Sequence, residues 1–354
     1  MNRKIKVLIV DDSAFMRKSL SIILSADSEI EIADFAKDGI EAIEKAKSIR
    51  PDVITLDIEM PRMDGLTALR TIMKEAPTSV IMVSSLTTEG AEATLQALEL
   101  GAVDFIPKEM SFVSVNMGQV KKDLIRKIKT IVRQKFLKER LENLKTEING
   151  KESRKVPIPT NGQLPKNKFN SIAIGISTGG PLSLQKVIPQ LTVKVPVFIV
   201  QHMPPKFTKS LANRLNSLSK LTVKEAEDSE EVRSGFVYIA PGGMQMNVKK
   251  NLAGKRIIKV FESDKNILHK PSVDIMLSSV VDEYGTGVLG VIMTGMGHDG
   301  LEGIKKLKSK GGYCLAQDES SSVVYGMPKA IVDNQLADVV APLDRIPKIL
   351  NEVA

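Results

Sequence analysis

A serine at the end of an apolar run is the residue whose surroundings most directly suggest chemistry. Residues Ile172-Ala-Ile-Gly-Ile176 predict a buried strand, and residues 182–188 have the apolar spacing of a helix, with Pro181 suited to its first turn. Ser177 therefore stands where a strand turns into a helix, and Gly175-Ile-Ser-Thr-Gly179 fits the G-x-S-x-G pattern that exposes a serine hydroxyl. Glycines let a substrate approach closely, and the helix start offers N–H groups to an oxyanion. We interpret Ser177 as a nucleophile; a phosphate-binding turn and a tight structural turn are the alternatives.

A serine nucleophile needs a base that takes its proton and a carboxylate that fixes the tautomer of the base. The strand-like run 196–200 is followed by Gln201-His202, and the run 288–293 is followed by Thr294-Gly-Met-Gly-His-Asp299. His202 and Asp299 are therefore the predicted base and acid. His269, at a loop-to-helix entry, and His298, beside Asp299, are competing bases. The order Ser, His, Asp differs from the order Ser, Asp, His of α/β-hydrolases, which disfavours that fold but not the chemistry.

The elements that must position these residues alternate between strands and helices. In the first part of the chain, strands are predicted at 7–10, 30–35, 53–56, 80–83 and 105–106, with helices at 14–24, 39–47, 65–75 and 90–100. Residues 170–354 return to the same rhythm, with further strands at 235–241 and 253–261 and helices at 206–218 and 301–308. Both parts therefore predict doubly wound α/β domains, in which ligands bind at the carboxyl ends of parallel strands.

Polar residues also stand at the strand ends of the first domain. They are Asp11 and Asp12 after the first strand, Asp57 after the third, Ser84 and Ser85 after the fourth and Lys108 after the fifth. Converging carboxylates repel unless a cation joins them, and oxygen ligands suit Mg²⁺. A lysine can bind a phosphoryl oxygen, and a carboxylate can accept a phosphoryl group as a nucleophile. A loop or a helix cap is the alternative for the Asp pair taken alone.

These residues resemble the receiver domain of bacterial response regulators, which has a flavodoxin-like fold, from residue 4 to about residue 125. The resemblance implies that Asp57 is phosphorylated and that the Mg²⁺ ligands are Asp11, Asp12, Asp57 and the backbone carbonyl of Glu59. It also implies a switch hydroxyl, a switch aromatic ring and a phosphate-binding lysine, which are Ser84, Phe105 and Lys108. One departure is Glu109, where the family usually has proline.

A basic segment joins the two parts. Residues 115 to about 144 predict one helix, whose apolar side is formed by Val120, Leu124, Ile128, Ile131 and Phe136. Residues 146–168 are rich in Lys, Asn, Pro and Gly and predict a flexible tether. A nucleic-acid-binding arm is the alternative, but no aromatic residues are interleaved with its charges. The predicted organisation is a receiver at 1–125, a helical and basic linker at 126–168 and a second domain at 169–354.

Composition excludes several classes of protein. No stretch of the 354 residues approaches the roughly 20 apolar residues of a membrane span, and the N-terminus lacks the apolar region of a signal peptide. Cys314 is the only cysteine, which excludes an internal disulfide and fits a reducing cytoplasm. Only three histidines are present, so a His/Cys zinc site is disfavoured. Much of the net charge of +8 lies between residues 121 and 168 and does not by itself define a binding face.

Three motifs resemble those of the CheB family of protein-glutamate methylesterases and glutaminases. They are Gly-Ile-Ser-Thr-Gly-Gly-Pro181, Gln-His-Met-Pro204 and Thr-Gly-Met-Gly-His-Asp-Gly300, and His269-Lys-Pro-Ser-Val-Asp274 also looks like a family segment. The resemblance covers nearly the whole chain. It implies Ser177 as nucleophile, His202 as base and Asp299 as orienting acid. It places Thr178 and Met296 beside the oxyanion, and it implies no cofactor in this domain.

The resemblance also implies substrate and partners. The substrate would be methyl-glutamate, and sometimes glutamine, on the cytoplasmic helices of chemoreceptors, and the phosphodonor would be the histidine kinase of the chemotaxis system. We predict a cytoplasmic hydrolase with neither nucleic-acid binding nor membrane insertion, whose unmodified receiver covers the active-site face. The rivals are a transcription regulator, which needs a DNA-reading module usually much shorter than 170–354, and a nucleotide-binding output domain. The serine turn lacks the lysine of a P-loop, and no acidic ribose ligand stands about 20 residues on.

Overall fold

The computed structural model describes residues 3–108, 117–147, 164–166, 168–264 and 266–354. The chain divides into two compact units, Met1–Glu152 and Ser153–Ala354, and each unit has its own sheet. The predicted domain limits at residues 125 and 168 stay predictions. The predicted tether at 146–168 lies mostly outside the described residues.

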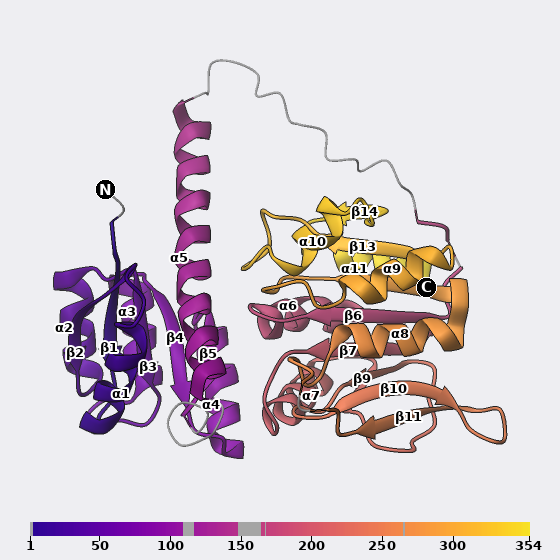
Figure 1. The fold of residues 1–354 in the computed structure, drawn as a ribbon, viewed down its shortest axis with the longest axis horizontal. Helices are drawn as coiled ribbons and strands as arrows, with labels where there is room; N and C mark the ends of the chain where they lie inside the picture. The colour runs from indigo at the N-terminus through magenta and orange to yellow at the C-terminus, as the bar shows by residue number, and fades with distance from the viewer. Residues whose placement is uncertain (1–2, 109–116, 148–163, 167, 265) are drawn as a thin grey trace. The chain divides into compact units, whose positions relative to one another are not determined.

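The first unit contains one five-stranded parallel sheet with strand order β2-β1-β3-β4-β5, which confirms the predicted receiver-like α/β fold. Figure 1 shows helices beside this sheet and α5 continuing past it. Its strands are β1 (Ile5–Val10), β2 (Ile30–Ala36), β3 (Val53–Asp57), β4 (Ser79–Ser84) and β5 (Asp104–Pro107). Its helices are α1 (Ala14–Leu24), α2 (Gly39–Ile49), α3 (Gly65–Glu75), α4 (Thr88–Glu99) and α5 (Met117–Glu147).

Local chemistry explains where these elements begin. The first four helices each start after a side chain that accepts a hydrogen bond from a backbone N–H group of the first turn, and these caps are Ser13, Asp38, Asp64 and Thr87. β3 and β4 are buried along their whole length because the sheet is covered on both faces. The apolar spacing of α5 places Leu124, Ile128 and Ile131 in the core, whereas Phe136 remains 46% exposed.

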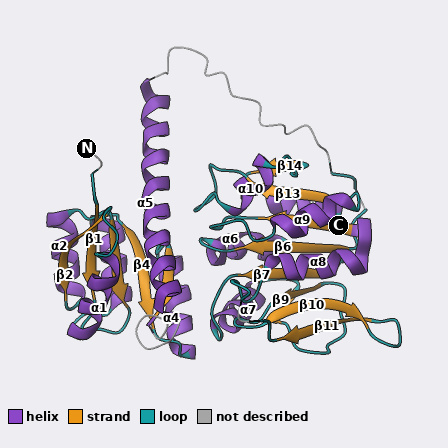
Figure 2. Ribbon diagram, in the orientation of Figure 1, coloured by secondary structure: helices purple, strands orange, loops and turns teal. Residues whose placement is uncertain are grey.

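The second unit is a doubly wound α/β domain built on a seven-stranded parallel sheet, with strand order β14-β13-β12-β6-β7-β9-β8. Figure 2 shows its strands interleaved with helices, next to the antiparallel hairpin of β10 and β11. Its strands are β6 (Ser171–Ile176), β7 (Val197–Gln201), β8 (Thr222–Glu225), β9 (Phe236–Ile239), β10 (Gln245–Lys250), β11 (Arg256–Phe261), β12 (Val288–Ile292), β13 (Tyr313–Gln317) and β14 (Val339–Ala341). Its helices are α6 (Gly180–Val187), α7 (Phe207–Leu218), α8 (Val273–Tyr284), α9 (Leu301–Ser309), α10 (Met327–Asp333) and α11 (Ile346–Val353), with short 3₁₀ turns at Ile188–Gln190 and Gly285–Gly287.

The strand order reverses at β6, and this reversal positions the site. The sheet grows from β6 through β7 on one side and through β12 on the other. Parallel α/β sheets bind ligands in the crevice at such a switch point. The three strands that precede Ser177, His202 and Asp299 are therefore adjacent, in the order β12, β6, β7.

The strand predicted at 253–261 begins only at Arg256, because Asn251 accepts the N–H groups of Ala253 and Lys255 in a tight turn. Among the described residues, no helix is both long enough and apolar enough to span a membrane.

Candidate functional sites

Ser177 lies in a tight turn between β6 and α6. Its N–H donates to the carbonyl of Thr294 at 3.0 Å, and its own carbonyl accepts the N–H of Gly180 at 2.8 Å. Gly179 has φ +76°, and a Cβ there would lie 2.5 Å from the side chain of Val323. Only glycine fits this position, because an L side chain would meet both strain and a steric clash. The loop after β12 is equally close, since a Cβ at Gly295 would lie 2.8 Å from Ser177 Cβ.

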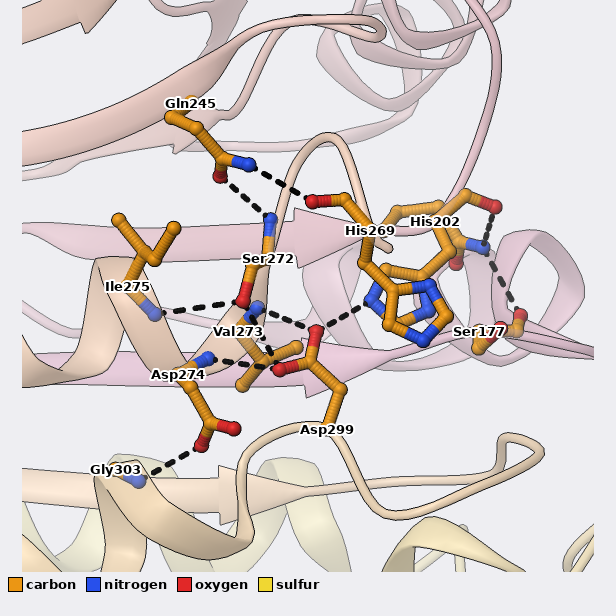
Figure 3. A network of polar contacts seen from close by, with 11 residues as sticks. Ser177, His202, Gln245, His269, Ser272, Val273, Asp274, Ile275, Asp299 and Gly303 are labelled. Carbon is orange, nitrogen blue, oxygen red and sulfur yellow. Dashed lines mark hydrogen bonds and ion pairs between the residues drawn. The ribbon is translucent and has the colours of Figure 1, made fainter. Parts of the chain in front are cut away.

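His202 and Asp299 are in direct contact. His202 Nε2 lies 2.8 Å from Asp299 Oδ2, and the His202 N–H donates to the carbonyl of Ile176, the residue before Ser177, at 3.2 Å. In the view of Figure 3, Asp299 and Ser177 lie on opposite sides of the His202 ring. Because Nε2 is used by Asp299, Nδ1 is the ring nitrogen left for the serine.

Asp299 is held by the first turn of α8. Its carboxylate accepts the Ser272 hydroxyl at 3.0 Å, the Val273 N–H at 2.8 Å and the Asp274 N–H at 3.0 Å, and these contacts converge in Figure 3. Burial raises the pKa of Asp299. The hydrogen bond and charge of His202, together with the backbone N–H groups, lower it by more, so the pKa of Asp299 lies below its ordinary value. Asp299 is therefore a fixed negative charge at a helix N-terminus, suited to hold an imidazolium.

The other two histidines have different surroundings. The His269 ring stacks on the His202 ring, with centroids 4.3 Å apart and planes 3° apart, and the His269 carbonyl accepts Gln245 Nε2 at 2.8 Å. His298 is exposed although its neighbour Asp299 is buried. His202 is the candidate base that contacts Asp299 at 2.8 Å.

Thr178 and Met296 both lie in loops that border Ser177. Thr178 is buried, and its carbonyl accepts the Thr294 hydroxyl at 2.9 Å. Met296 follows Gly295, and a Cβ at Gly326 would lie 3.2 Å from Met296 Cα. The assignment of their N–H groups to an oxyanion stays a prediction.

Asp274 is a second carboxylate next to Asp299. It accepts the N–H of Gly303 at 2.7 Å. Burial, together with the charge of Asp299, raises the pKa of Asp274 to about 6. Compared with the unfolded chain, the folded protein therefore binds a proton at Asp274 more tightly.

Asp274 should make the second unit less stable as the pH rises. A carboxyl whose pKa is raised on folding stabilises the protein fully below its unfolded pKa of about 4, and this contribution is lost as the pH passes about 6. We expect Asp274→Asn to remove this dependence and to raise the free energy of unfolding above pH 6 by about 1 kcal/mol, allowing for solvent screening. All four tyrosines lie in the second unit and the chain has no tryptophan, so tyrosine fluorescence in urea reports this unit in the intact protein. Equal differences between variant and unchanged protein at pH 4.5 and pH 7 would contradict the assignment.

The three predicted acidic residues of the first unit come together. One oxygen from each of Asp11, Asp12 and Asp57 lies within 4.8 Å of the others, and Lys108 Nζ lies 2.7 Å from Asp57 and 3.8 Å from Asp11. Burial raises the pKa of Asp57 to about 6, against the hydrogen bond from Lys108. Burial also raises the pKa of Asp11, whose Oδ2 has no hydrogen-bond partner among the described residues. A hard divalent cation fits this set of oxygen donors.

The other predicted receiver residues have contacts of their own. The Glu59 N–H donates to Asp57 Oδ1 at 3.3 Å, and the Ser84 hydroxyl donates to the carbonyl of Gly90 at 3.1 Å. Phe105 is 6% exposed, and Lys127 of α5 donates to its carbonyl at 3.1 Å. Residue 109, the departure from the receiver pattern, lies outside the described residues. The metal-binding and switch roles stay predictions.

Sequence reasoning missed three residues that organise the hydrolytic site. Ser272 binds Asp299, Thr294 joins the loops around Ser177, and Gln201 contacts the carbonyl groups of Ser177 and His202. Ser272 had a signal for its role, because a serine before an apolar helical stretch predicts a helix cap. Thr294 and Gln201 stand at the start of two of the motifs named above, but their contacts join residues distant in sequence, which a single sequence does not reveal.

The fold and the two sites define a response regulator, in which a receiver-type acidic site is joined to an output domain that carries a Ser, His and Asp set. A model of the response regulator receiver domain matches residues 7–115, and a model of the CheB methylesterase matches residues 172–350. The chain belongs to the CheB methylesterase family.

Individual relatives resemble the chain over nearly its full length. A protein-glutamate methylesterase/protein-glutamine glutaminase of Pyrococcus horikoshii is 47% identical over 353 residues, covering 98% of this chain and 93% of the relative. A protein of the same name from Thermotoga maritima is 45% identical over 361 aligned positions, covering 99% of each chain. The crystal structure of the Thermotoga maritima CheB methylesterase catalytic domain is similar, with 47% identity and a TM-score of 0.50 over 52% of this chain and 98% of that one.

Proposed function

We propose that this protein is a phosphorylation-regulated serine hydrolase of the cytoplasm. It hydrolyses glutamate γ-methyl esters on the cytoplasmic helices of chemoreceptors, releasing methanol, and deamidates glutamines there. The observation that carries the proposal is the contact of His202 with Asp299 at the switch point where Ser177 also lies. The names of the relatives support the substrate, because they are protein-glutamate methylesterases and protein-glutamine glutaminases.

The proposed reaction proceeds through an acyl-enzyme. Ser177 Oγ attacks the γ-carbonyl carbon while its proton passes to Nδ1 of His202, and Asp299 stabilises the resulting imidazolium through Nε2. Backbone N–H groups of Thr178 and Met296 bind the oxyanion. Methanol leaves with the proton from His202, or ammonia leaves when the substrate is glutamine. Water then gives a proton to His202 and its hydroxide to the acyl carbon, which releases glutamate and restores the serine.

The receiver site is proposed to accept a phosphoryl group from the histidine kinase of the chemotaxis system. Asp57 is the acceptor carboxylate, Lys108 contacts a phosphoryl oxygen, and Asp11, Asp12, Asp57 and the Glu59 carbonyl would hold Mg²⁺. When bound, this cation offsets the negative charge of the phosphoryl oxygens. Ser84 then exchanges its bond to Gly90 for a phosphoryl oxygen, and the buried Phe105 ring rotates, which changes the receiver surface.

Methanol release from methylated fragments of a chemoreceptor tests the substrate assignment. We expect release from the methylated fragment, none from a fragment with free glutamates, and ammonia from a fragment with glutamines at the same positions. A protein whose Ser177 reacts with a fluorophosphonate but which releases neither product would be a serine hydrolase with a different substrate.

A further inference from the structure

One buried side-chain amide contacts the backbone of both the nucleophile and the base. Gln201 is the last residue of β7 and is 2% exposed. Its Nε2 donates to the Ser177 carbonyl at 2.9 Å and to the His202 carbonyl at 3.3 Å. The amide therefore bridges the turn after β6 and the turn after β7.

The orientation of this amide is fixed by its surroundings. Two carbonyl oxygens face one end, so that end must be the donor nitrogen. The other end, Oε1, is buried, has no hydrogen-bond partner among the described residues and points at Gly180, where a Cβ would lie 1.9 Å from it. The amide is thus held between the serine turn and the first residue of α6. A buried acceptor without a partner destabilises the folded state, which indicates a role other than stability.

The bridge bears on the geometry of proton transfer. Apart from the amide, the bond from the His202 N–H to the Ile176 carbonyl, at 3.2 Å, also links the two turns. The distance from Ser177 Oγ to His202 Nδ1 depends on how these turns lie relative to each other. A misplacement of about 1 Å between reacting groups costs about 100-fold in rate.

We propose that Gln201 is a positioning residue that sets the distance between Ser177 and His202 and thereby the rate of acylation. It acts through the two backbone carbonyls and supplies no atom to the reaction. The proposal rests on the proposed hydrolase function and adds a residue to its machinery.

Gln201→Met tests the bridge, because methionine has nearly the same length and no donor. We expect kcat for methanol release to fall about 100-fold with KM unchanged, and the labelling of Ser177 by a fluorophosphonate to slow in parallel. Gln190→Met is the matched control, because Gln190 is exposed and its side chain bonds to the nearby carbonyl of Lys186, whereas its bond to Asn351 uses the backbone carbonyl, which the substitution keeps. It should leave both rates unchanged. A Gln201→Met protein with unchanged kcat and labelling would overturn the proposal, as would a loss confined to KM.

Gly180→Ala reaches the same amide from its other side. The new Cβ should displace the Gln201 amide and lower kcat. In a Gln201→Ala background the amide contact is gone and only the Ile176 side chain, 2.9 Å from the Cβ, has to give way, so the same change should cost less. A full additional loss in that background would overturn the proposal. If the unchanged protein labels with the fluorophosphonate but releases no methanol, the proposed substrate fails, while the labelling rates still decide the role of Gln201.

Discussion

Ser177→Ala is expected to slow methanol release from a methylated receptor fragment by about 10⁴-fold or more. The change removes the attacking oxygen and nothing else of the turn, since the bonds of Ser177 to Thr294 and Gly180 use backbone atoms. The variant should therefore fold normally and still bind the fragment. Initial rates of methanol release, measured beside fragment binding and thermal unfolding, separate the loss of chemistry from a loss of structure.

The matched control is Ser309→Ala, in which an exposed serine at the end of α9 loses a bond to the carbonyl of Lys306. It should keep the full rate. A Ser177→Ala protein with a near-native rate would remove Ser177 as the nucleophile. Such a rate would instead favour a mechanism in which His202 activates water directly.

The predicted nucleophile, base and acid could be picked out from the sequence because they share one topological property. Ser177, His202 and Asp299, like the acidic residues of the receiver site, stand at or after the ends of apolar runs that form strands of parallel sheets, and parallel strands bring their carboxyl ends to one edge. The apolar runs of β3, β4 and β7 are buried along their whole length, so hydrophobicity alone locates them.

Other elements lack such a signal. β8 reads Thr-Val-Lys-Glu at the edge of the sheet, β10 ends in two exposed lysines, and β14 has three residues. Their strand conformation comes from pairing with partners distant in sequence rather than from their own composition. For that reason the sequence did not predict these three strands.

The contacts that tune the site were also beyond sequence reasoning. The first turn of α8 binds Asp299 only because α8 packs beside β12, and the ring nitrogen of His202 that faces Asp299 depends on the same packing. The raised pKa of Asp274 follows from its burial and from the charge of Asp299 beside it, whereas the contact with His202 and the backbone N–H groups lower the pKa of Asp299. Sequence patterns identify residue types at strand ends, whereas charge states require the three-dimensional arrangement.

Asp57→Asn is expected to abolish phosphorylation of the receiver and all stimulation of methanol release by a small phosphodonor. An amide cannot accept the phosphoryl group, and it replaces the carboxylate that contacts Lys108 at 2.7 Å. In the unchanged protein, phosphodonor with Mg²⁺ should incorporate phosphate and raise the rate of methanol release. Chelation of Mg²⁺ should prevent both, because Asp11, Asp12 and Asp57 are the oxygen donors that lie together in this unit.

The comparison needs an Asp→Asn variant elsewhere in the same unit, and Asp123→Asn serves because Asp123 forms a surface pair with Arg126 on α5. It should respond to phosphodonor like the unchanged protein. Phosphate incorporation that persists in Asp57→Asn would assign the acceptor to another residue. A third outcome is that Asp57→Asn abolishes phosphate incorporation while phosphodonor changes methanol release in none of the proteins. The receiver chemistry would then stand, and its control of Ser177 would be rejected. The two readouts thus separate the chemistry of the acidic site from its effect on the hydrolase, since each can fail without the other.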